Sequence, residues 1–279
     1  MQLVHDDAGY LYSATRQGLF RSTDQGEKWT PLTYGLPDRS IVYDLFAHPS
    51  GILYAAVESP SGHRLYSSFD GGDSWGSTPL TGELLSLALL DEQFAIAQSP
   101  KGTFRTFDNW LNIEPVYTDA RDFTSAEDGL LYALRGDRLS YSTDFGNEWT
   151  SLPPFSSEPA ADGQLHLQQV LPLPDGRLIA AVYYSGCVGL CEGKIFRLDE
   201  AGQNWTLLMD EAYPTDIVRD EFGRLYTNPD RVMVSSNDGD TWTDLNSGLT
   251  FADEYGIPSL EPDVSCLILT YDGELFAGT

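Results

Sequence analysis

Apolar and polar positions along this chain alternate over short segments, and each segment ends at a cluster of glycine, aspartate, asparagine or proline. The first such segments lie at 2–5, 10–15, 18–22 and 29–32. Alternation with a period of two, in segments rich in β-branched and aromatic residues, is typical of half-buried β-strands. No stretch of the sequence has convincing helical periodicity. The pattern therefore predicts an all-β protein built from short strands.

A polar frame, Ser-x-Asp-x-Gly-x-x-Trp, follows the third predicted strand and recurs along the chain. Full copies contain Ser22, Asp24, Gly26, Trp29; Ser68, Asp70, Gly72, Trp75; and Ser142, Asp144, Gly146, Trp149. A near copy has Ser235, Asn237, Gly239, Trp242, a weaker one has Leu198, Glu200, Gly202, Trp205, and a shortened one ends in Asp108, Asn109, Trp110. All six tryptophans of the chain end one of these frames, which identifies a repeat protein.

The frame has the composition of a tight turn between two strands. Serine and aspartate side chains can accept backbone N–H groups one or two residues on, and glycine tolerates a positive φ. The tryptophan then covers apolar surface at the start of the next strand, and its indole N–H needs an acceptor. A catalytic acid is needed once, whereas this acid occurs in several copies and varies to Glu200 and Asn237. We therefore expect a structural role for the frame.

A second motif, Gly-x-Leu-Tyr, precedes the tryptophan frames at 9–12, 51–54, 129–132 and 223–226. Successive tryptophans lie 46, 35, 39, 56 and 37 residues apart, near the period of about 40–45 residues that propeller blades have. Each repeat then contains four short strands, which predicts a β-propeller.

The repeats give six complete blades and a half-built seventh. The seventh begins at 263–269, continues through 273–279 and stops after its second strand. We expect one propeller domain over residues 1–279, and we expect the native polypeptide to continue past Thr279, because an open sheet edge invites aggregation.

The chain is very acidic, with 16 Lys and Arg against 42 Asp and Glu and a net charge of −26. The negative field of such a chain repels phosphate groups, so nucleic acid is excluded as a partner. The simplest interpretation of the acidity is solubility. No run of about 18 apolar residues is present, so we expect no membrane insertion. The N-terminus lacks the basic and apolar regions of a signal peptide.

Two of the three cysteines, Cys187 and Cys191, lie close together in a segment that resembles a hairpin tip. A disulfide could join them there. A metal site is a poorer interpretation, because the four histidines follow no ligand spacing. The third, Cys266, falls in an apolar strand and is expected to be buried. The pair favours an extracytoplasmic location, secreted, periplasmic or at the cell surface, and we expect no metal or cofactor.

The tryptophan frames resemble the Asp-box, or BNR, repeat, and the resemblance covers nearly the whole chain. Families with this box include sialidases, xyloglucanases, sortilin-type receptors, photosystem assembly factors and many uncharacterised exported bacterial proteins. The resemblance implies a propeller in which the box lies on the rim, away from the active centre. The Phe-Arg pairs at Phe20, Phe104 and Phe196 lack the Ile-Pro that follows in the sialidase signature. A xyloglucanase-like enzyme would need two facing carboxylates, and the sequence nominates no pair.

We expect a non-catalytic binding scaffold that recognises a protein or a carbohydrate on its central face and long loops. The longest loops are predicted at 183–194 and 245–263, and the second contains Phe251, Asp253, Glu254 and Tyr255. Binding sites usually lie on such loops above a rigid scaffold. The alternative is a glycoside hydrolase, sialidase-like or xyloglucanase-like. A third possibility, an assembly factor for a membrane protein, fits less well because those factors favour basic patches.

Overall fold

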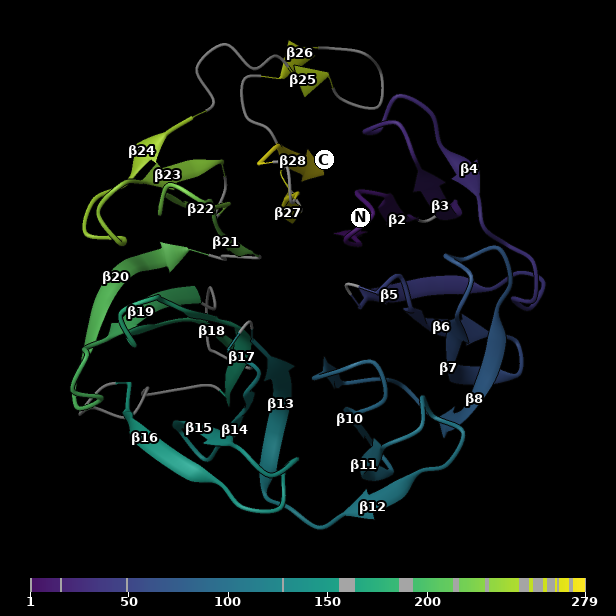
Figure 1. Cartoon of the computed structure of the whole chain (residues 1–279), viewed down its shortest axis with the longest axis horizontal. Coiled ribbons are helices and arrows are strands. Elements are labelled where there is room, and N and C mark those ends of the chain that lie inside the picture. Colours follow the sequence, from purple (N-terminus) through teal and green to yellow (C-terminus); the bar gives the residue numbers. More distant parts are fainter. Residues whose placement is uncertain are drawn as a thin grey trace. The chain divides into compact units, whose positions relative to one another are not determined.

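The protein is composed of short antiparallel strands (Figure 1). The computed structural model describes residues 2–15, 17–48, 50–126, 128–155, 164–185, 193–212, 216–228, 231–245, 251–252, 258–259, 264, 266–270 and 273–278. Within these ranges the strands form six four-stranded sheets, and in each sheet the strands follow one another in chain order. This meander is the arrangement of a propeller blade, and it confirms the all-β prediction with four-stranded blades.

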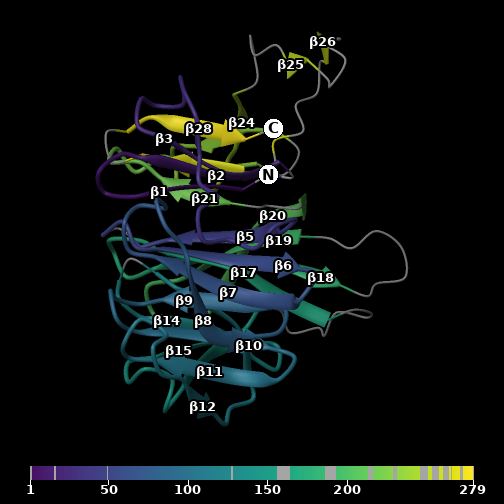
Figure 2. The same cartoon turned by 90° about the vertical axis from the view of Figure 1, so that its right-hand side faces the viewer.

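The first three sheets account for twelve strands. The first holds β1 (Gln2–His5), β2 (Leu11–Thr15), β3 (Gly18–Ser22) and β4 (Thr30–Pro31). The second holds β5 (Ile41–Ala47), β6 (Leu53–Ser59), β7 (Gly62–Ser68) and β8 (Gly76–Thr81). The third holds β9 (Ser86–Leu89), β10 (Ala95–Ser99), β11 (Gly102–Thr106) and β12 (Glu114–Val116). Figure 2 shows β5, β6 and β7 side by side.

The next three sheets repeat the same order. The fourth holds β13 (Ala120–Ser125), β14 (Leu131–Arg135), β15 (Arg138–Ser142) and β16 (Thr150–Pro154). The fifth holds β17 (Gln164–Pro172), β18 (Leu178–Ser185), β19 (Gly193–Leu198) and β20 (Trp205–Ala212). The sixth holds β21 (Ile217–Arg219), β22 (Leu225–Thr227), β23 (Met233–Ser235) and β24 (Thr243–Asp244).

The half-built seventh blade is matched in part. A two-stranded antiparallel sheet of β27 (Cys266–Leu269) and β28 (Leu275–Gly278) lies where its first two strands were expected. A second pair, β25 (Phe251–Ala252) and β26 (Pro258–Ser259), falls within the predicted long loop at 245–263.

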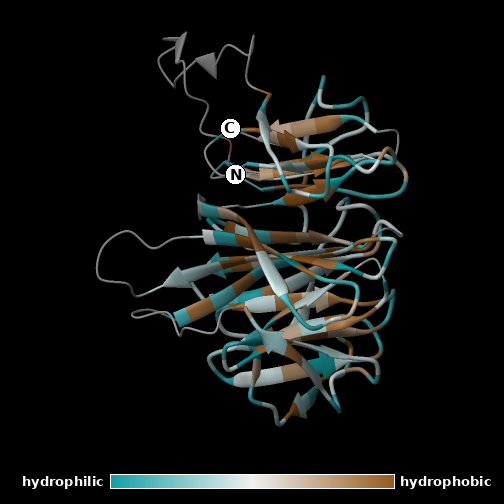
Figure 3. Cartoon of the chain, turned by 90° about the vertical axis from the view of Figure 1, so that its left-hand side faces the viewer, coloured by the Kyte–Doolittle hydropathy of each residue, from teal (hydrophilic) through white to brown (hydrophobic). Residues whose placement is uncertain are grey.

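The chain divides into two compact units, each with its own cores. The first comprises Met1–Gly136, Ser140–Thr150 and Thr270–Asp272, and the second comprises Asp137–Leu139, Ser151–Leu269 and Gly273–Thr279. Hydrophobic residues recur along the strands of both units (Figure 3).

In the first unit, the second strand of a sheet is buried on both faces. Along β6, Leu53, Ala55 and Val57 pack into a core shared with the first sheet. Tyr54 and Ala56, which alternate with them, pack into a core shared with the third sheet. Because successive side chains of a strand point to opposite faces, this burial explains why the second strands have continuous apolar sequences instead of polar alternation.

The second unit is built in the same way. Leu225 of β22 packs into a core with Ile179, Ala181 and Ile195 of the fifth sheet. Its neighbour Tyr226 packs on the opposite face, in a core that includes residues of β27 and β28.

The tyrosine of the Gly-x-Leu-Tyr motif fixes the turn that precedes it. The Tyr12 hydroxyl donates to Asp6 Oδ2 at 2.8 Å, and the Tyr226 hydroxyl donates to Asp220 Oδ2 at 3.1 Å. The same aspartates also accept backbone N–H groups of their own turns. A hydrogen bond between the second strand and the turn before it therefore recurs, and it gives the motif a structural purpose.

Candidate functional site

The serine and aspartate of each full tryptophan frame close a turn by accepting backbone N–H groups. In the first frame, Gly26 N–H donates to Ser22 Oγ at 2.8 Å, and Lys28 N–H donates to Asp24 Oδ1 at 2.8 Å. The Ser22 hydroxyl itself donates to the same carboxylate oxygen at 2.9 Å. The frames of Ser68 and Ser142 repeat these three bonds.

These hydrogen bonds hold the frame carboxylates in their charged form. The N–H of Lys28 lowers the pKa of Asp24 below its ordinary value, and the N–H of Glu148 does the same for the pKa of Asp144. At Asp70 the Ser74 side chain contributes most to the lowered pKa. A carboxylate that is already engaged in closing its own turn, and that resists protonation, is poorly suited to general acid catalysis.

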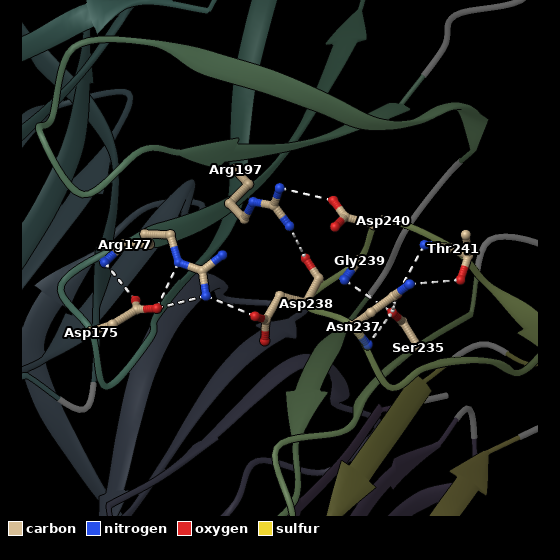
Figure 4. A network of polar contacts seen from close by, with 9 residues as sticks. All are labelled: Asp175, Arg177, Arg197, Ser235, Asn237, Asp238, Gly239, Asp240 and Thr241. Atoms are coloured by element: carbon tan, nitrogen blue, oxygen red, sulfur yellow. Dashed lines mark hydrogen bonds and ion pairs between the residues drawn. The ribbon is translucent and has the colours of Figure 1, made fainter.

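The near copy of the frame makes the same bonds with an amide (Figure 4). Thr241 N–H donates to Asn237 Oδ1, and the Ser235 hydroxyl donates to the same oxygen, both at 2.9 Å. Gly239 N–H donates to Ser235 Oγ at 2.9 Å. The turn therefore requires an oxygen acceptor at this position and does not require a charge, which explains how asparagine replaces aspartate.

The shortened frame and the weaker frame differ from the alignment that the sequence suggested. Trp110 occupies the position of the frame glycine, because its N–H donates to Thr106 Oγ1 and its φ is 64°. Its side chain is fully buried in the core between the second and third sheets. In the fifth sheet, Gln203 N–H donates to Asp199 and not to its neighbour Glu200.

The Phe-Arg pairs connect one sheet to the frame of the next. Arg197 of β19 donates to the carbonyl oxygen of Asp238 at 2.8 Å and pairs with Asp240 at 2.8 Å (Figure 4). Arg21 makes the corresponding contacts with Gly71 and Asp73, and Arg105 makes them with Phe145 and Asn147. These arginines therefore bridge neighbouring sheets within each unit.

The first unit contains a pocket of about 470 Å³ between its first two sheets. It is lined by Gln2, Ala14, Thr15, Ile41, Val42, Tyr43 and Asp44. Two of the lining side chains are exposed at its rim, Ile41 at 53% and Tyr43 at 37%. The pocket lies where β5 begins and β2 ends, and β5 has an irregular register between Val42 and Asp44. Such an irregularity re-aims side chains, and bulges are common beside functional sites.

Asp44 gives the pocket a carboxylate with unusual protonation. Burial raises its pKa from 3.8 to about 6, although a side-chain hydrogen bond from Gln2 and the N–H of Leu45 oppose the shift. That N–H is shared between Gln2 Oε1 at 2.6 Å and Asp44 Oδ1 at 3.0 Å. Near pH 6 the group is half protonated, and it can both accept and donate hydrogen bonds.

Tyr43 is held in place although its ring is partly exposed. Its hydroxyl accepts Leu84 N–H at 2.8 Å, and its ring meets the His63 ring edge-on with centroids 5.6 Å apart. Burial raises the pKa of the Tyr43 hydroxyl, so the group keeps its proton. The pocket rim therefore presents an ordered aromatic ring.

The second unit contains a buried carboxylate with a similar pKa, and its hydrogen bonds connect segments of the backbone. Asp216 Oδ2 accepts the N–H of Leu267 at 2.8 Å, and burial raises its pKa to about 6. Its own N–H donates to Asn228 Oδ1, and the Asn228 amide donates to the carbonyl oxygen of Val264. These bonds connect β21 and β22 to the segment that includes β27.

Several predicted site residues lie outside the described residues. These are Cys187, Cys191, Asp253, Glu254 and Tyr255. Phe251 begins β25, and only its backbone is described. Cys266 is buried, as expected.

Two kinds of feature are absent from the described part of the chain. There, no group of three or more histidine, cysteine, aspartate or glutamate side chains could hold a metal ion. The described residues also form no helix that is long and apolar enough to cross a membrane.

Sequence reasoning did not select the residues of the pocket. A signal was nevertheless present, because Asp44 interrupts the apolar strand Ile41–Ala47 with a charged side chain. A charge in the middle of such a strand is costly to bury unless it has partners. Gln2 carried no signal, since its contact with Leu45 joins residues 43 positions apart.

Comparison with solved structures identifies the class of protein as a β-propeller. The structure of YCF48 bound to D1 peptide matches with a TM-score of 0.66 and 17% identity, over 96% of this chain and 86% of that one. The extracellular domain of BT4673 from B. thetaiotaomicron matches with a TM-score of 0.70 and 15% identity, over 100% of this chain and 37% of that one. A GH74 xyloglucanase from Xanthomonas campestris matches with a TM-score of 0.65 and 16% identity, over 87% and 44%. At these identities the likeness establishes the fold alone.

Sequence comparison finds a short match to a curated protein. A xyloglucanase of Hypocrea jecorina is 41% identical over 69 residues, which are 24% of this chain and 8% of that protein. The match spans less than a tenth of the curated relative. No protein-family model matches this chain.

Proposed function

We propose that this chain is a binding module that uses the pocket between its first two sheets to hold part of a protein or carbohydrate ligand. The observation that supports the proposal is the combination of an ordered, partly exposed aromatic residue, Tyr43, with a half-buried carboxylate, Asp44, in one cavity. Ligand sites are typically concave and mostly apolar, with a few placed polar groups.

The chemistry of the pocket favours a neutral or cationic ligand rich in hydrogen-bond donors. Its volume of about 470 Å³ lies in the range of small-ligand sites. Asp44 accepts hydrogen bonds, and the net charge of −26 repels anions. The exposed faces of Ile41 and Tyr43 can pack against a sugar ring or an apolar side chain. A sugar residue or one side chain of an extended peptide satisfies these conditions.

The comparisons support a binding role in an extracytoplasmic location. One similar structure has a peptide bound, and another is an extracellular domain. An Asp-box type of repeat is consistent with the turn geometry of the tryptophan frames, whose carboxylates close their own turns. In this proposal the frames build the scaffold and the pocket recognises the ligand.

A substitution of the rim aromatic tests the proposal. Tyr43→Ala is expected to weaken ligand binding by about tenfold or more, because an aromatic contact is lost. Tyr117→Ala is the matched control, since Tyr117 is 97% exposed and does not line the pocket. Binding would be measured by calorimetry with the glycans and peptides that the wild-type protein retains. Equal loss in both variants, or no loss in Tyr43→Ala, would refute the pocket as the site.

The second candidate function is a glycoside hydrolase of the xyloglucanase type. It is favoured by the 41% identity over 69 residues and by the pKa of Asp44 at about 6, which suits a general acid. A glycosidase requires a second carboxylate at roughly 5–10 Å from the first. Turnover of xyloglucan by the wild-type protein that is abolished in Asp44→Asn would establish this function instead.

A further inference from the structure

The outermost strand of the fifth sheet, β20, differs from the other outermost strands. In the first four sheets these strands contain proline: Pro31 in β4, Pro79 in β8, Pro115 in β12, and Pro153 and Pro154 in β16. In the sixth sheet, β24 has two residues. β20 has eight residues and no proline. It ends its sheet as the last strand in the described order.

The strand pairing shows which residue replaces the proline. In the first sheet Phe20 pairs with Pro31, and in the third sheet Phe104 pairs with Pro115. In the fifth sheet the corresponding phenylalanine, Phe196, pairs with Leu207. The arginine after each phenylalanine makes the same contact with the next frame, so the three positions are equivalent. Leu207 therefore occupies the place that proline has in the first and third sheets, and that Ser77 and Asp244 have in the second and sixth sheets.

At this position the backbone N–H and C=O groups of the outermost strand point away from the neighbouring strand of the sheet. Leu32 N–H donates to Leu19 O at 2.9 Å, so Leu19 and Leu32 form a hydrogen-bonded pair. In an antiparallel ladder the next pair, Phe20 and Pro31, then directs its backbone groups outward. Proline at this position removes the outward N–H and blocks the approach of another strand. Leu207, at the equivalent position, retains the outward N–H, and its side chain is 45% exposed.

We propose that the edge of β20 at Trp205–Leu207 is a docking site for an extended cationic segment of another protein, which adds to the fifth sheet as a further antiparallel or parallel strand. Strand addition of this kind takes its affinity from main-chain hydrogen bonds and its specificity from alternate side chains. The proposal concerns the second unit and does not depend on the pocket of the first.

Charge selects the kind of partner. Asp199 and Glu200 precede the strand, and Asp210 lies on it, where its carboxylate pairs with Lys194 at 2.9 Å. A basic segment is attracted to this acidic surrounding, whereas a second copy of the chain would bring another net charge of −26. A cationic strand is therefore favoured over self-association.

The register of β20 limits the length of the site. The pairing with β19 is regular from Trp205 to Leu207 and then shifts twice, between Phe196 and Ile195 and between Ile195 and Gly193. Irregularities of this kind twist an edge and end regular pairing. The docked segment is therefore expected to be short and to centre on Leu207, where an apolar side chain of the partner would cover the exposed leucine.

A proline substitution tests the proposal. The probe is a fluorescein-labelled eight-residue peptide of alternating lysine and valine, and binding is measured by fluorescence anisotropy at low salt. Leu207→Pro is expected to weaken binding by at least about tenfold, because it removes the outward N–H and blocks the edge. Leu207→Ser keeps the N–H and is expected to weaken peptide binding by less than about threefold. The fold should tolerate the proline, since the equivalent positions in the first and third sheets carry it.

A second measurement requires no change to the protein. A version of the peptide that is N-methylated at every residue has no N–H group on either edge, and it should fail to bind the wild-type protein. Three results would overturn the proposal: no binding of the unmodified peptide to the wild-type protein, equal binding by Leu207→Pro, or equal binding of the methylated peptide. A wild-type dimer in sedimentation that Leu207→Pro converts to a monomer would also overturn it, in favour of a second copy as the occupant.

Discussion

At the scale of single residues, Asp44, like Asp216, has an environment that departs clearly from that of a surface carboxylate. It lies on an apolar strand, lines the pocket and has partners in Gln2 and Leu45. Burial disfavours the charged form, and the two hydrogen bonds compensate only in part. A group with this balance is costly to keep unless it serves a purpose, and recognition of a ligand is the purpose that we assign.

The pKa of Asp44 predicts how stability depends on pH. Between its ordinary value of 3.8 and about 6, the folded protein holds a proton that the unfolded chain has lost. Stability therefore falls as the pH rises through this window, and the loss is complete above it. Asp44→Asn keeps the acceptor for Leu45 N–H and is expected to raise the free energy of unfolding by about 1–2 kcal/mol at pH 8.

The comparison of the two proteins should be made by urea denaturation at pH 4.5 and pH 8. The gain in the free energy of unfolding of Asp44→Asn over wild type should shrink towards zero at the lower pH, where the wild-type carboxyl is protonated. Because the acidic chain also changes its overall charge with pH, only the difference between variant and wild type is informative. A variant that is less stable than wild type at pH 8 would contradict the desolvation argument.

Two glycines with similar backbones separate the effect of close packing from that of conformation. Both Gly72 and Gly129 have a positive φ, of 92° and 74°. A Cβ at Gly72 would lie 2.5 Å from Leu32 Cδ1, whereas a Cβ at Gly129 would meet nothing within 4 Å. Gly129→Ala is expected to lower the free energy of unfolding by about 1 kcal/mol, because alanine is strained at a positive φ. Gly72→Ala is expected to lower the free energy of unfolding by about 2–4 kcal/mol, because a packing clash is added to that strain. Equal costs in thermal unfolding would contradict the packing around the frame.

At the scale of elements, the arginine of each Phe-Arg pair joins two sheets. Arg197 is largely buried, with a side chain 16% exposed, and it connects β19 to the frame that follows β23. Its partners are a backbone carbonyl and a carboxylate, so their relative positions are fixed by one side chain. The arginines therefore couple consecutive sheets at the side of the frames.

Arg197→Gln is expected to destabilise the protein by about 1–3 kcal/mol, since it leaves the Asp238 carbonyl and the Asp240 carboxylate without this donor. Arg231→Gln is the matched control, because Arg231 is 52% exposed where it pairs with Asp244, and exposed pairs contribute about 0–1 kcal/mol. Chemical denaturation of both variants would test this order. A larger loss in Arg231→Gln would show that the bridge between sheets is not what Arg197 contributes.

Much of the element structure could be predicted from the sequence. The strands of the first sheet were expected at nearly the residues where they lie, because each is bounded by glycine and aspartate turns and alternates regularly. The position of Trp110 was not predictable in this way. Its N–H takes the place of a glycine N–H, and only the contact with Thr106 shows that Trp110 stands at the glycine position and not at the end of the frame.

The candidate site was harder to predict than the fold. The pocket joins Gln2 and Thr15 to β5 across sheets, and no local pattern links these positions. Sequence reasoning placed a site on the longest loops, which stays a prediction because most of those residues lie outside the described ranges. The pocket that we propose is formed by strand ends. The length of a loop is read directly from the sequence, but the side chains that meet across two packed strands depend on the register of both.

At the scale of the whole molecule, the chain combines propeller blades with a net charge of −26. Its similar structures include a peptide-bound protein and a xyloglucanase. Propeller blades support many unrelated functions, so the function must be argued from the site. The pocket supplies an aromatic residue and one carboxylate, which is sufficient for recognition, whereas glycosidic cleavage uses a second carboxylate as well.

The most direct test of this account is a panel of neutral glycans and of neutral and cationic peptides, read by mass spectrometry for both retention and cleavage. The account predicts that the wild-type protein retains at least one ligand without cutting it, and that Tyr43→Ala retains less while Tyr117→Ala retains as much. Release of shortened glycans by the wild-type protein, with none from Asp44→Asn, would contradict the binding module and establish a hydrolase.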